Sequence, residues 1–194
     1  MFSVNIDKIV VMTDNEKKCY EELRENLKKE LNGGKVLAIT KNGIGAFKIA
    51  YSFVCAGEKV LFIDADIMSE IFLGKYKLGK NLKGFTDYFQ EDEAIHDLVC
   101  KTNRKNLDII FTGETQEFDK ADILDSEFSD FRDCLVEQYD YVIVHTGDNY
   151  DIAAKCDASV ILLKQSDYSE MSAESKVDFL DSNGCFVLGL VVEE

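Results

Sequence analysis

Short apolar runs recur along the chain and are separated by longer segments that mix apolar and polar residues. The runs are rich in Val, Ile and Leu. Short continuous runs of this kind are typical of strands that are buried on both faces of a sheet. We therefore predict strands at Lys35–Thr40, Lys59–Asp64, Leu107–Thr112, Tyr141–His145, Ser159–Lys164 and Phe186–Val192.

The segments between these runs carry apolar residues at the spacing of one helical face. Strands that alternate with amphipathic helices form right-handed βαβ units, and such units build a parallel sheet. The pattern predicts an α/β fold in one domain, with a mostly parallel sheet and helices on both faces. The predicted helix faces are Tyr20, Leu23, Leu27 and Leu31; Phe128, Phe131 and Leu135; and Met171, Ser175 and Phe179.

The length of 194 residues fits one domain with a short N-terminal addition. Residues 1–15 are expected to form an N-terminal arm or an extra strand, because the apolar run Lys8–Met12 precedes the first helical pattern. Residues 16–194 are expected to form the domain itself.

The chain is strongly acidic, with 22 basic and 37 acidic residues and a formal net charge of −15. Nucleic-acid binders need a basic face, and anionic membranes attract basic segments, so neither class of protein fits. No apolar run approaches the ~20 residues that span a bilayer, and the first residues lack the features of a signal peptide. We therefore expect no nucleic-acid partner, no direct membrane insertion and a cytoplasmic location.

The six cysteines form no C-x-x-C pair, and most of them lie in apolar periodic segments. Paired cysteines are typical of zinc sites, and disulfide frameworks are typical of small secreted chains. We therefore expect reduced, buried thiols and no metal site.

Four segments carry motifs in a fixed order: TDNEKKCYEELRENL at Thr13–Leu27, GEKVLFIDADI at Gly57–Ile67, LKGFTDYFQEDEAIHDLV at Leu82–Val99 and EQYDYVIVHTGDN at Glu137–Asn149. This ordered set resembles the bacterial tyrosine kinases of capsule and exopolysaccharide synthesis, a family of MinD/ParA-like P-loop ATPases. The resemblance implies a P-loop NTPase fold of that kind. Phosphoryl transfer on this fold needs a Lys and backbone N–H groups for the phosphates, a Ser or Thr for Mg²⁺, and a carboxylate for the metal's water shell.

The family's phosphate loop, G-x-x-x-x-G-K-[ST], aligns with this chain in two ways. In the preferred alignment, Asn42, Gly43 and Gly45 replace the glycine loop, and the Lys-Ser/Thr step is deleted. In the other, Lys48 takes the place of the phosphate lysine and Ile49 that of the Mg²⁺-binding hydroxyl. Both alignments lose the hydroxyl, so we interpret the loop as a vestigial phosphate site. Its free N–H groups either hold an anion weakly or belong to an ordinary helix N-terminus.

Asp64, Asp66 and His145 stand at the family's acidic positions, at the ends of two predicted strands. The segment D-A-D-I-M resembles the family's D-x-D-x-R, with Met68 in place of the Arg. His145 replaces the Walker B Asp, and imidazole is a poor ligand for Mg²⁺, which prefers oxygen. We interpret these residues as vestigial and predict that His145 hydrogen-bonds Asp64 where the family holds its metal. The alternative is a strand-end histidine that is satisfied by other neighbours.

Two further departures from the family concern assembly and proline. The family's oligomerisation motif, E-x-x-R-x-x-R, aligns with Lys18, Glu21 and Arg24, and only the Arg is retained, so the oligomeric state is left open. The chain has no proline, whereas the family has prolines in its active-site loops, one of which aligns with Gly113–Asp119. Their joint loss indicates that the nucleotide site is not maintained.

We interpret the chain as a catalytically degenerate, tyrosine-kinase-like or ATPase-like protein that acts by binding, in the regulation of exopolysaccharide or capsule synthesis. The resemblance implies a protein partner, either an active tyrosine kinase or the membrane-bound chain-length regulator, which would recruit the chain to the inner face of the membrane. No cofactor is expected, with weak binding of ATP, ADP or Mg²⁺ as the alternative. Two other functions stay open: an active ATP-binding tyrosine kinase or ATPase with a non-standard phosphate loop, and a MinD/ParA-like positioning protein.

Overall fold

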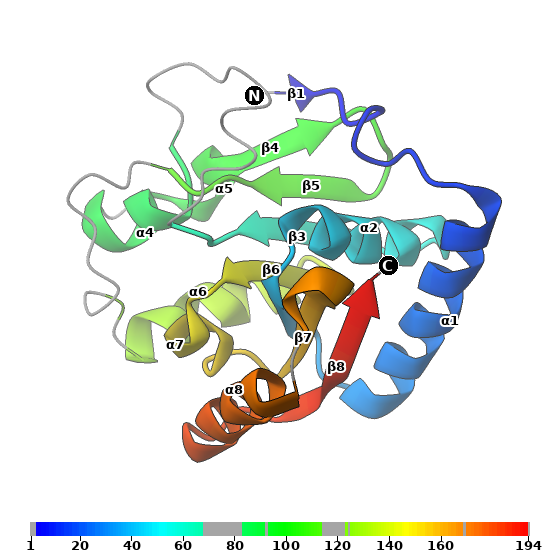
Figure 1. The fold of residues 1–194 in the computed structure, drawn as a ribbon. Coiled ribbons are helices and arrows are strands. Elements are labelled where there is room, and N and C mark those ends of the chain that lie inside the picture. The colour runs from blue at the N-terminus through cyan, green and yellow to red at the C-terminus, as the bar shows by residue number, and fades with distance from the viewer. Residues whose placement is uncertain are drawn as a thin grey trace.

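The computed structural model describes residues 3–67, 83–91, 93–113, 123, 125–168 and 170–193. These residues form an eight-stranded sheet with helices on both of its faces (Figure 1). The strand order is β1-β4-β5-β3-β6-β2-β7-β8, and neighbouring strands are parallel except for the antiparallel pair β4 and β5. The strands are β1 Ser3–Val4, β2 Val36–Lys41, β3 Val60–Asp64, β4 Val99–Thr102, β5 Leu107–Ile110, β6 Tyr141–Gly147, β7 Ala158–Lys164 and β8 Val187–Glu193.

The helices divide between the two faces of the sheet. Helices α1 and α2 share one buried apolar cluster with the sheet, and α6, α7 and α8 share the other. Within the described residues, no helix combines the length and the apolar character needed to cross a bilayer. The helices are α1 Asp14–Leu31, α2 Gly43–Cys55, α4 Phe85–Glu91, α5 Ile95–Leu98, α6 Asp125–Val136, α7 Tyr150–Ala153 and α8 Glu170–Ser182, with a 3-10 turn, η2, at Gln165–Asp167.

The structure confirms the predicted α/β architecture and all of the predicted strands, with small shifts at their ends. It adds two short strands that the apolar pattern does not predict. β4 runs antiparallel to β5. β1 pairs in parallel with β4, and Ser3 lies opposite Lys101. Both lie at one side of the sheet, where a strand needs few apolar residues.

The run Lys8–Met12 is not a strand, which corrects one of the two predictions for the N-terminal segment. The backbone N–H groups of Ile9 and Val10 donate to the carbonyl of Ile6, at 2.9 and 3.3 Å, and close a turn. All three side chains are buried in the cluster beneath α1 and α2. The run is therefore apolar because it packs in the core as a turn, and the strand before α1 is β1.

The predicted apolar faces of α1 and α6 are buried except for Leu23 of α1, which is partly buried, but the predicted face of α8 is wrong. Ala173 and Leu180 are the buried residues of α8, and Phe179 is 42% exposed. The Phe179 ring instead lies 5.8 Å from the ring of Tyr150, near the outside of the molecule. The side chain of Met171 lies outside the described residues. The spacing of Met171, Ser175 and Phe179 by four residues thus selected the wrong side of a helix that carries few apolar residues.

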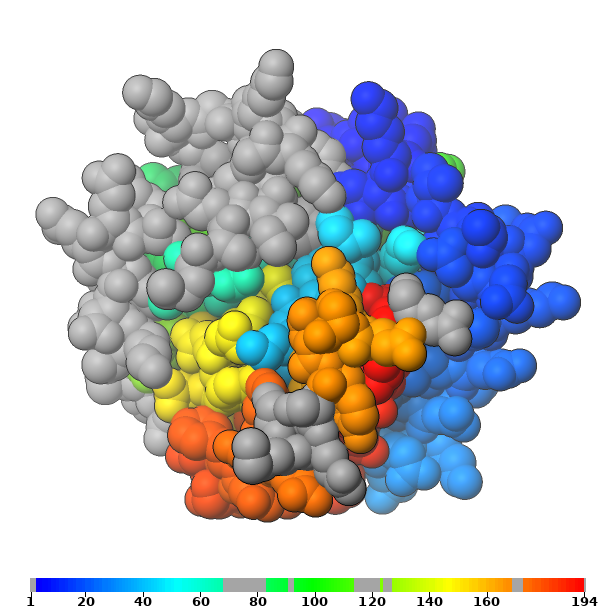
Figure 2. Space-filling view, in the orientation of Figure 1, coloured from blue at the N-terminus to red at the C-terminus, as the bar shows by residue number. Residues whose placement is uncertain are grey.

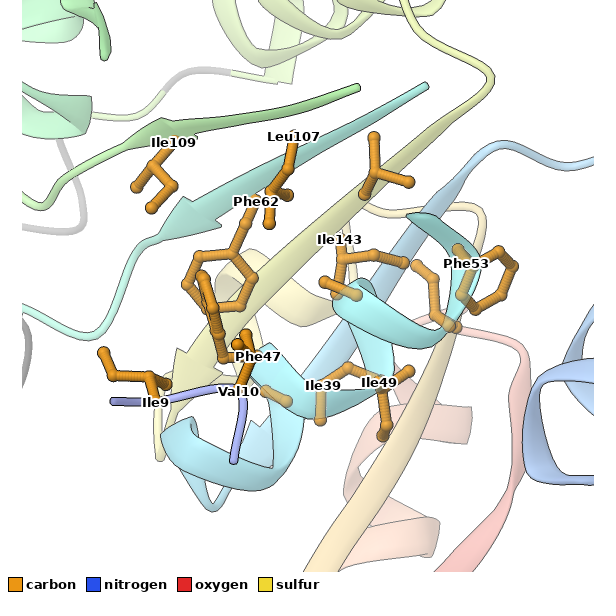
Figure 3. Close-up of a cluster of buried hydrophobic side chains, with 14 of the residues drawn as sticks. Ile9, Val10, Ile39, Phe47, Ile49, Phe53, Phe62, Leu107, Ile109 and Ile143 are labelled. Atoms are coloured by element: carbon orange, nitrogen blue, oxygen red, sulfur yellow. The ribbon is translucent and has the colours of Figure 1, made fainter. Parts of the chain in front are cut away.

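Helix α2 is fixed to the sheet by large apolar side chains (Figure 3). Phe47 on α2 and Phe62 on β3 are both fully buried, and their rings meet edge to face with centroids 4.9 Å apart. Ile39 and Ile143, on the adjacent strands β2 and β6, complete this layer. Burying one such side chain stabilises the fold by about 1.5–3 kcal/mol, so the first turn of α2 is firmly placed over the strand ends.

Helix α1 begins at a capping box that also links it to α2. Thr13 Oγ1 accepts a hydrogen bond from the backbone of Glu16 at 3.2 Å, and the Glu16 carboxylate accepts one from the Thr13 backbone at 2.7 Å. The other oxygen of Glu16 binds Lys48 Nζ of α2 at 2.7 Å. The start of α1 is therefore held against α2 by polar contacts at its first turn.

Candidate functional site

The carboxyl ends of β3 and β6 bring Asp64 and His145 together. The two residues are opposite each other in the register of these neighbouring strands. Both are buried, with exposures of 1% and 0%. His145 Nδ1 lies 3.1 Å from Asp64 Oδ1, which confirms the predicted hydrogen bond between them.

The second ring nitrogen of His145 faces a backbone carbonyl. Nε2 lies 3.2 Å from the carbonyl oxygen of Lys41, at the end of β2. A carboxylate and a carbonyl only accept, whereas a neutral imidazole has a single N–H to donate. The two contacts therefore favour an imidazolium ring that donates from both nitrogens to Asp64 and Lys41.

The local electrostatics favour the same protonation state. Burial alone would lower the pKa of His145, but the Asp64 carboxylate, the Lys41 carbonyl and the nearby Asp66 together outweigh it and raise that pKa above its ordinary value. The result is a buried imidazolium–carboxylate pair. Its two charges cancel, which is the condition under which ionised groups are tolerated in a protein interior.

Several polar atoms around this pair have no hydrogen-bond partner among the described residues. They include Asp64 Oδ2 and the hydroxyls of Thr40 and Thr146, on the strands β2 and β6. An unpaired buried polar group costs about 1–3 kcal/mol. The strand ends thus keep the polar lining of a site, but His145 has taken one carboxylate oxygen of Asp64.

Asp66 lies beside the same strand ends. Its side chain is 6% exposed and packs against the backbone of Gly147, at the end of β6. The backbone N–H of Ala65, between the two aspartates, donates to the His145 carbonyl at 2.8 Å. The structure therefore places all three predicted strand-end residues in one small region.

The loop between β2 and α2 is a single residue, Asn42, which caps the helix. Asn42 Oδ1 accepts a hydrogen bond from the Gly45 backbone at 3.3 Å. The imidazole of His145 packs directly on Gly43, where an added Cβ would lie 2.8 Å from the ring carbon Cε1. The first turn of α2 is thus in contact with a protein side chain where the family's loop surrounds phosphates.

Lys48 does not face this loop. Its ammonium binds Glu16 and lies 5.9 Å from the centre of the Tyr20 ring, both on α1. The hydrogen bond from Lys48, together with those from Thr13, lowers the pKa of Glu16 to about 2. This placement supports the alignment in which the phosphate lysine is deleted.

Asp148, on the loop after β6, does not join the pair. Its carboxylate forms an ion pair with the ammonium of Lys41, and its side chain is 65% exposed. Lys41 itself has a left-handed backbone with φ of 76°, a conformation that is uncommon for a residue with a side chain. The Lys41 ammonium is thereby engaged at the surface of the site.

Glu193, at the end of β8, is a site residue that the sequence analysis missed. Its carboxylate accepts hydrogen bonds from the side-chain amide of Asn42 and from the hydroxyl of Tyr20. These partners are 151 and 173 residues away along the chain, so no local pattern points to the contact. The only related signal was the position of Tyr20 on the inner face of α1.

Several residues of interest lie outside the described residues. They include Met68, at the position of the family's Arg, and most of the loop aligned with Gly113–Asp119. The sequence also has a local group of basic residues, of which only Lys83 is described: Lys75, Lys77, Lys80 and Lys83. Lys83 lies 3.6 Å from carboxylate oxygens of both Asp87 and Glu93.

No family model matches the chain. Tyrosine-protein kinase CpsD of Streptococcus pneumoniae serotype 4 is 27% identical over 187 residues, which cover 90% of this chain and 82% of that protein. The chain is a relative of the bacterial tyrosine kinases.

Solved structures confirm the predicted fold family. The kinase domain of the Escherichia coli tyrosine kinase ETK superposes with a TM-score of 0.82 at 18% identity, covering 93% of this chain and 77% of that one. The septum site-determining protein MinD of Pyrococcus horikoshii, complexed with Mg-ADP, superposes with a TM-score of 0.59 at 16% identity, covering 81% and 69%. The chain thus has the MinD/ParA-like P-loop NTPase fold.

The fold family implies a magnesium–nucleotide at these strand ends, and the residues present do not fit one. Asp64 is already paired with a buried imidazolium, and the nitrogen ligand that His145 offers is not one that Mg²⁺ prefers. The Glu193 carboxylate adds negative charge beside the first turn of α2, where phosphates would need positive charge. Within the described residues, no group of three or more His, Cys, Asp or Glu side chains is arranged to hold a metal ion.

Proposed function

We propose that this chain is a catalytically degenerate relative of the bacterial tyrosine kinases, which keeps their fold and acts by binding another protein. The observation that carries the proposal is the buried His145–Asp64 pair at the carboxyl ends of β3 and β6. The pair stands where ligands bind in open parallel sheets of this kind.

The chemistry of phosphoryl transfer explains why this pair argues against catalysis. The reaction depends almost entirely on positioning and on positive charge that stabilises the phosphoryl oxygens. A Mg²⁺ ion that bound to Asp64 would have to displace the imidazolium, and His145 would lose its bonds to Asp64 and Lys41. The residue directly after Lys48 is Ile49 rather than a Ser or Thr, and the Lys48 ammonium is bound to Glu16. On this proposal the site therefore lacks three groups that phosphoryl transfer needs: the bound metal, the phosphate-binding lysine and the metal-binding hydroxyl.

The partner and setting follow from the similarity to CpsD and from the family resemblance. We propose regulation of exopolysaccharide or capsule synthesis, through binding of an active tyrosine kinase or of the membrane-bound chain-length regulator. On this proposal the protein is cytoplasmic and is recruited to the inner face of the membrane by its partner. The net charge of −15 supports a protein partner over nucleic acid or an anionic lipid surface.

Calorimetric titration with ATP and ADP, each with and without Mg²⁺, tests the proposal. An active tyrosine kinase of this family serves as the positive control under the same conditions. We expect no binding at millimolar nucleotide and no rise in the melting temperature, because a ligand that binds only the folded state must raise it. Pull-down of kinase or regulator partners is the next step.

Micromolar binding of Mg-ATP would overturn the proposal. ATP hydrolysis and tyrosine phosphorylation would then be measured, with Asp64→Ala as the control for metal-dependent chemistry. Activity that Asp64→Ala abolishes would favour a kinase or ATPase with a non-standard phosphate loop. ATP-dependent dimerisation without kinase activity would favour a MinD/ParA-like positioning protein.

A further inference from the structure

A carboxylate of the chain itself lies against the first turn of α2. Glu193 ends β8, and an added Cβ at Gly45 would lie 2.8 Å from each of its two carboxylate oxygens. One oxygen accepts from the hydroxyl of Tyr20 and the other from the side-chain amide of Asn42. We call this set of contacts, made by Glu193 with Tyr20 and Asn42, the Glu193 clasp.

The donors of the clasp are well suited to hold an ionised carboxylate. Burial of the Tyr20 ring raises the pKa of its hydroxyl, and the hydrogen bond to Glu193 adds to that effect, so Tyr20 stays a neutral donor. Asn42 uses its amide oxygen to cap α2 at Gly45 and its amide nitrogen to hold Glu193. One side chain therefore fixes both the start of the helix and the carboxylate beside it.

The electrostatics of α2 give this carboxylate a role. The first turn of a helix carries free backbone N–H groups and a partial positive charge, and it attracts anions. Gly45 allows the carboxylate to approach, because any side chain at this position would meet both Glu193 and Leu162. The chain thus supplies an anion of its own beside the turn that holds phosphates in P-loop proteins.

We propose that Glu193 is an autoinhibitory contact, whose carboxylate acts as an internal counter-anion for the first turn of α2 and keeps phosphate groups away from it. This inference rests on the proposed function, since it gives a second reason, besides His145, for the loss of nucleotide binding. It also predicts that the turn regains affinity for phosphates when the charge of Glu193 is removed.

The clasp can be reached from solvent. It borders a hollow of about 530 Å³ between α1 and β8, which is lined by Glu16, Tyr20, Leu23, Val192 and Glu193 among others. Figure 2 shows the end of β8, in red, at the surface between the blue residues of α1 and the orange residues around the end of β7. A small phosphate probe therefore has a path to this side of α2.

Glu193→Gln tests the inference, with inorganic pyrophosphate as the probe in Mg²⁺-free buffer. The amide keeps the size of the side chain and one acceptor oxygen but removes the charge. We expect pyrophosphate to bind Glu193→Gln about tenfold more tightly than it binds the wild-type protein, because a like charge a few ångströms from the ligand is gone. The matched control is Glu174→Gln, which makes the same charge change at an exposed position on α8.

Equal affinities of the wild type and Glu193→Gln for pyrophosphate would overturn the inference. The inference would also fail if Glu174→Gln gained as much affinity as Glu193→Gln, because the gain would then reflect net charge alone. Should Glu193→Gln fail to fold, Tyr20→Phe keeps every charge and frees one carboxylate oxygen. It is expected to give a smaller gain in affinity, and an unchanged affinity would overturn the inference. Micromolar binding of Mg-ATP by the wild type would instead count against the proposed function, so the two failures are distinguishable.

Discussion

His145→Gln should strongly destabilise the protein, because it breaks the buried ion pair from one side. Asp64 is 1% exposed, so its carboxylate would be left in the interior without the imidazolium that neutralises it. Removing one partner of a buried pair typically costs 3–5 kcal/mol. We therefore expect the free energy of unfolding to fall by about 3 kcal/mol or more at pH 7.

A double-mutant cycle separates the pair from the rest of the site. Asp64→Asn combined with His145→Gln leaves two neutral side chains, and neutral groups cost less to bury than one unpaired charge. The double variant should be more stable than the sum of the single changes predicts, which gives a coupling energy between the two positions. Urea unfolding measured for all four proteins provides the values.

The pair also predicts how stability depends on pH. The folded-state pKa of His145 lies above its ordinary value of 6.5. Its contribution to stability is therefore fully present below about pH 6.5 and is lost as the pH rises through the raised pKa. Urea midpoints measured between pH 5 and 9 should fall across this range in the wild type, and the fall should be smaller in His145→Gln.

The second histidine of the chain provides a matched control. The side chain of His96 is 82% exposed, so His96→Gln should leave both the stability and its pH profile close to those of the wild type. A loss of less than about 1 kcal/mol in His145→Gln, or a pH profile that is unchanged in that variant, would refute the imidazolium–carboxylate assignment.

Two further predictions concern the starts of α2 and α1. Gly43→Ala places a methyl group 2.8 Å from a ring carbon of His145. Although Ala favours helices, this overlap should lower the free energy of unfolding by about 1–3 kcal/mol. An unchanged melting temperature would contradict the packing of His145 on Gly43. Thr13→Ala removes the N-cap of α1 and should lower the free energy of unfolding by about 1 kcal/mol, measured by urea unfolding. A change near zero would mean that this cap does not stabilise the helix.

The strands of the central sheet were predictable because their pattern is local. A strand buried on both faces must be apolar at nearly every position, and β2, β3, β6 and β7 satisfy this. β4 was missed because its four residues include Lys101, whose ammonium binds Asp108 at 2.6 Å. A short strand with charged residues has no apolar run from which it can be recognised.

The candidate site was predictable only in part. The contact between His145 and Asp64 followed from the family resemblance, because the residues at these two positions flank one metal in the family, and the register of β3 and β6 places them opposite each other. The second bond, from His145 to the Lys41 carbonyl, depends on the backbone conformation of Lys41 and has no side-chain signal. The Glu193 clasp joins three elements that are distant in sequence, and it becomes visible only once the chain is folded.

The two internal contacts have a common electrostatic logic. In a P-loop enzyme, a metal cation balances the carboxylates at the strand ends, and phosphate anions balance the first turn of the helix. Here the imidazolium of His145 balances Asp64, and the carboxylate of Glu193 lies beside the first turn of α2. Because the chain supplies both charges itself, its folded state needs no ligand to neutralise these groups. A protein that acts by binding, on the proposed function, would thereby keep a stable kinase-like fold at any nucleotide concentration.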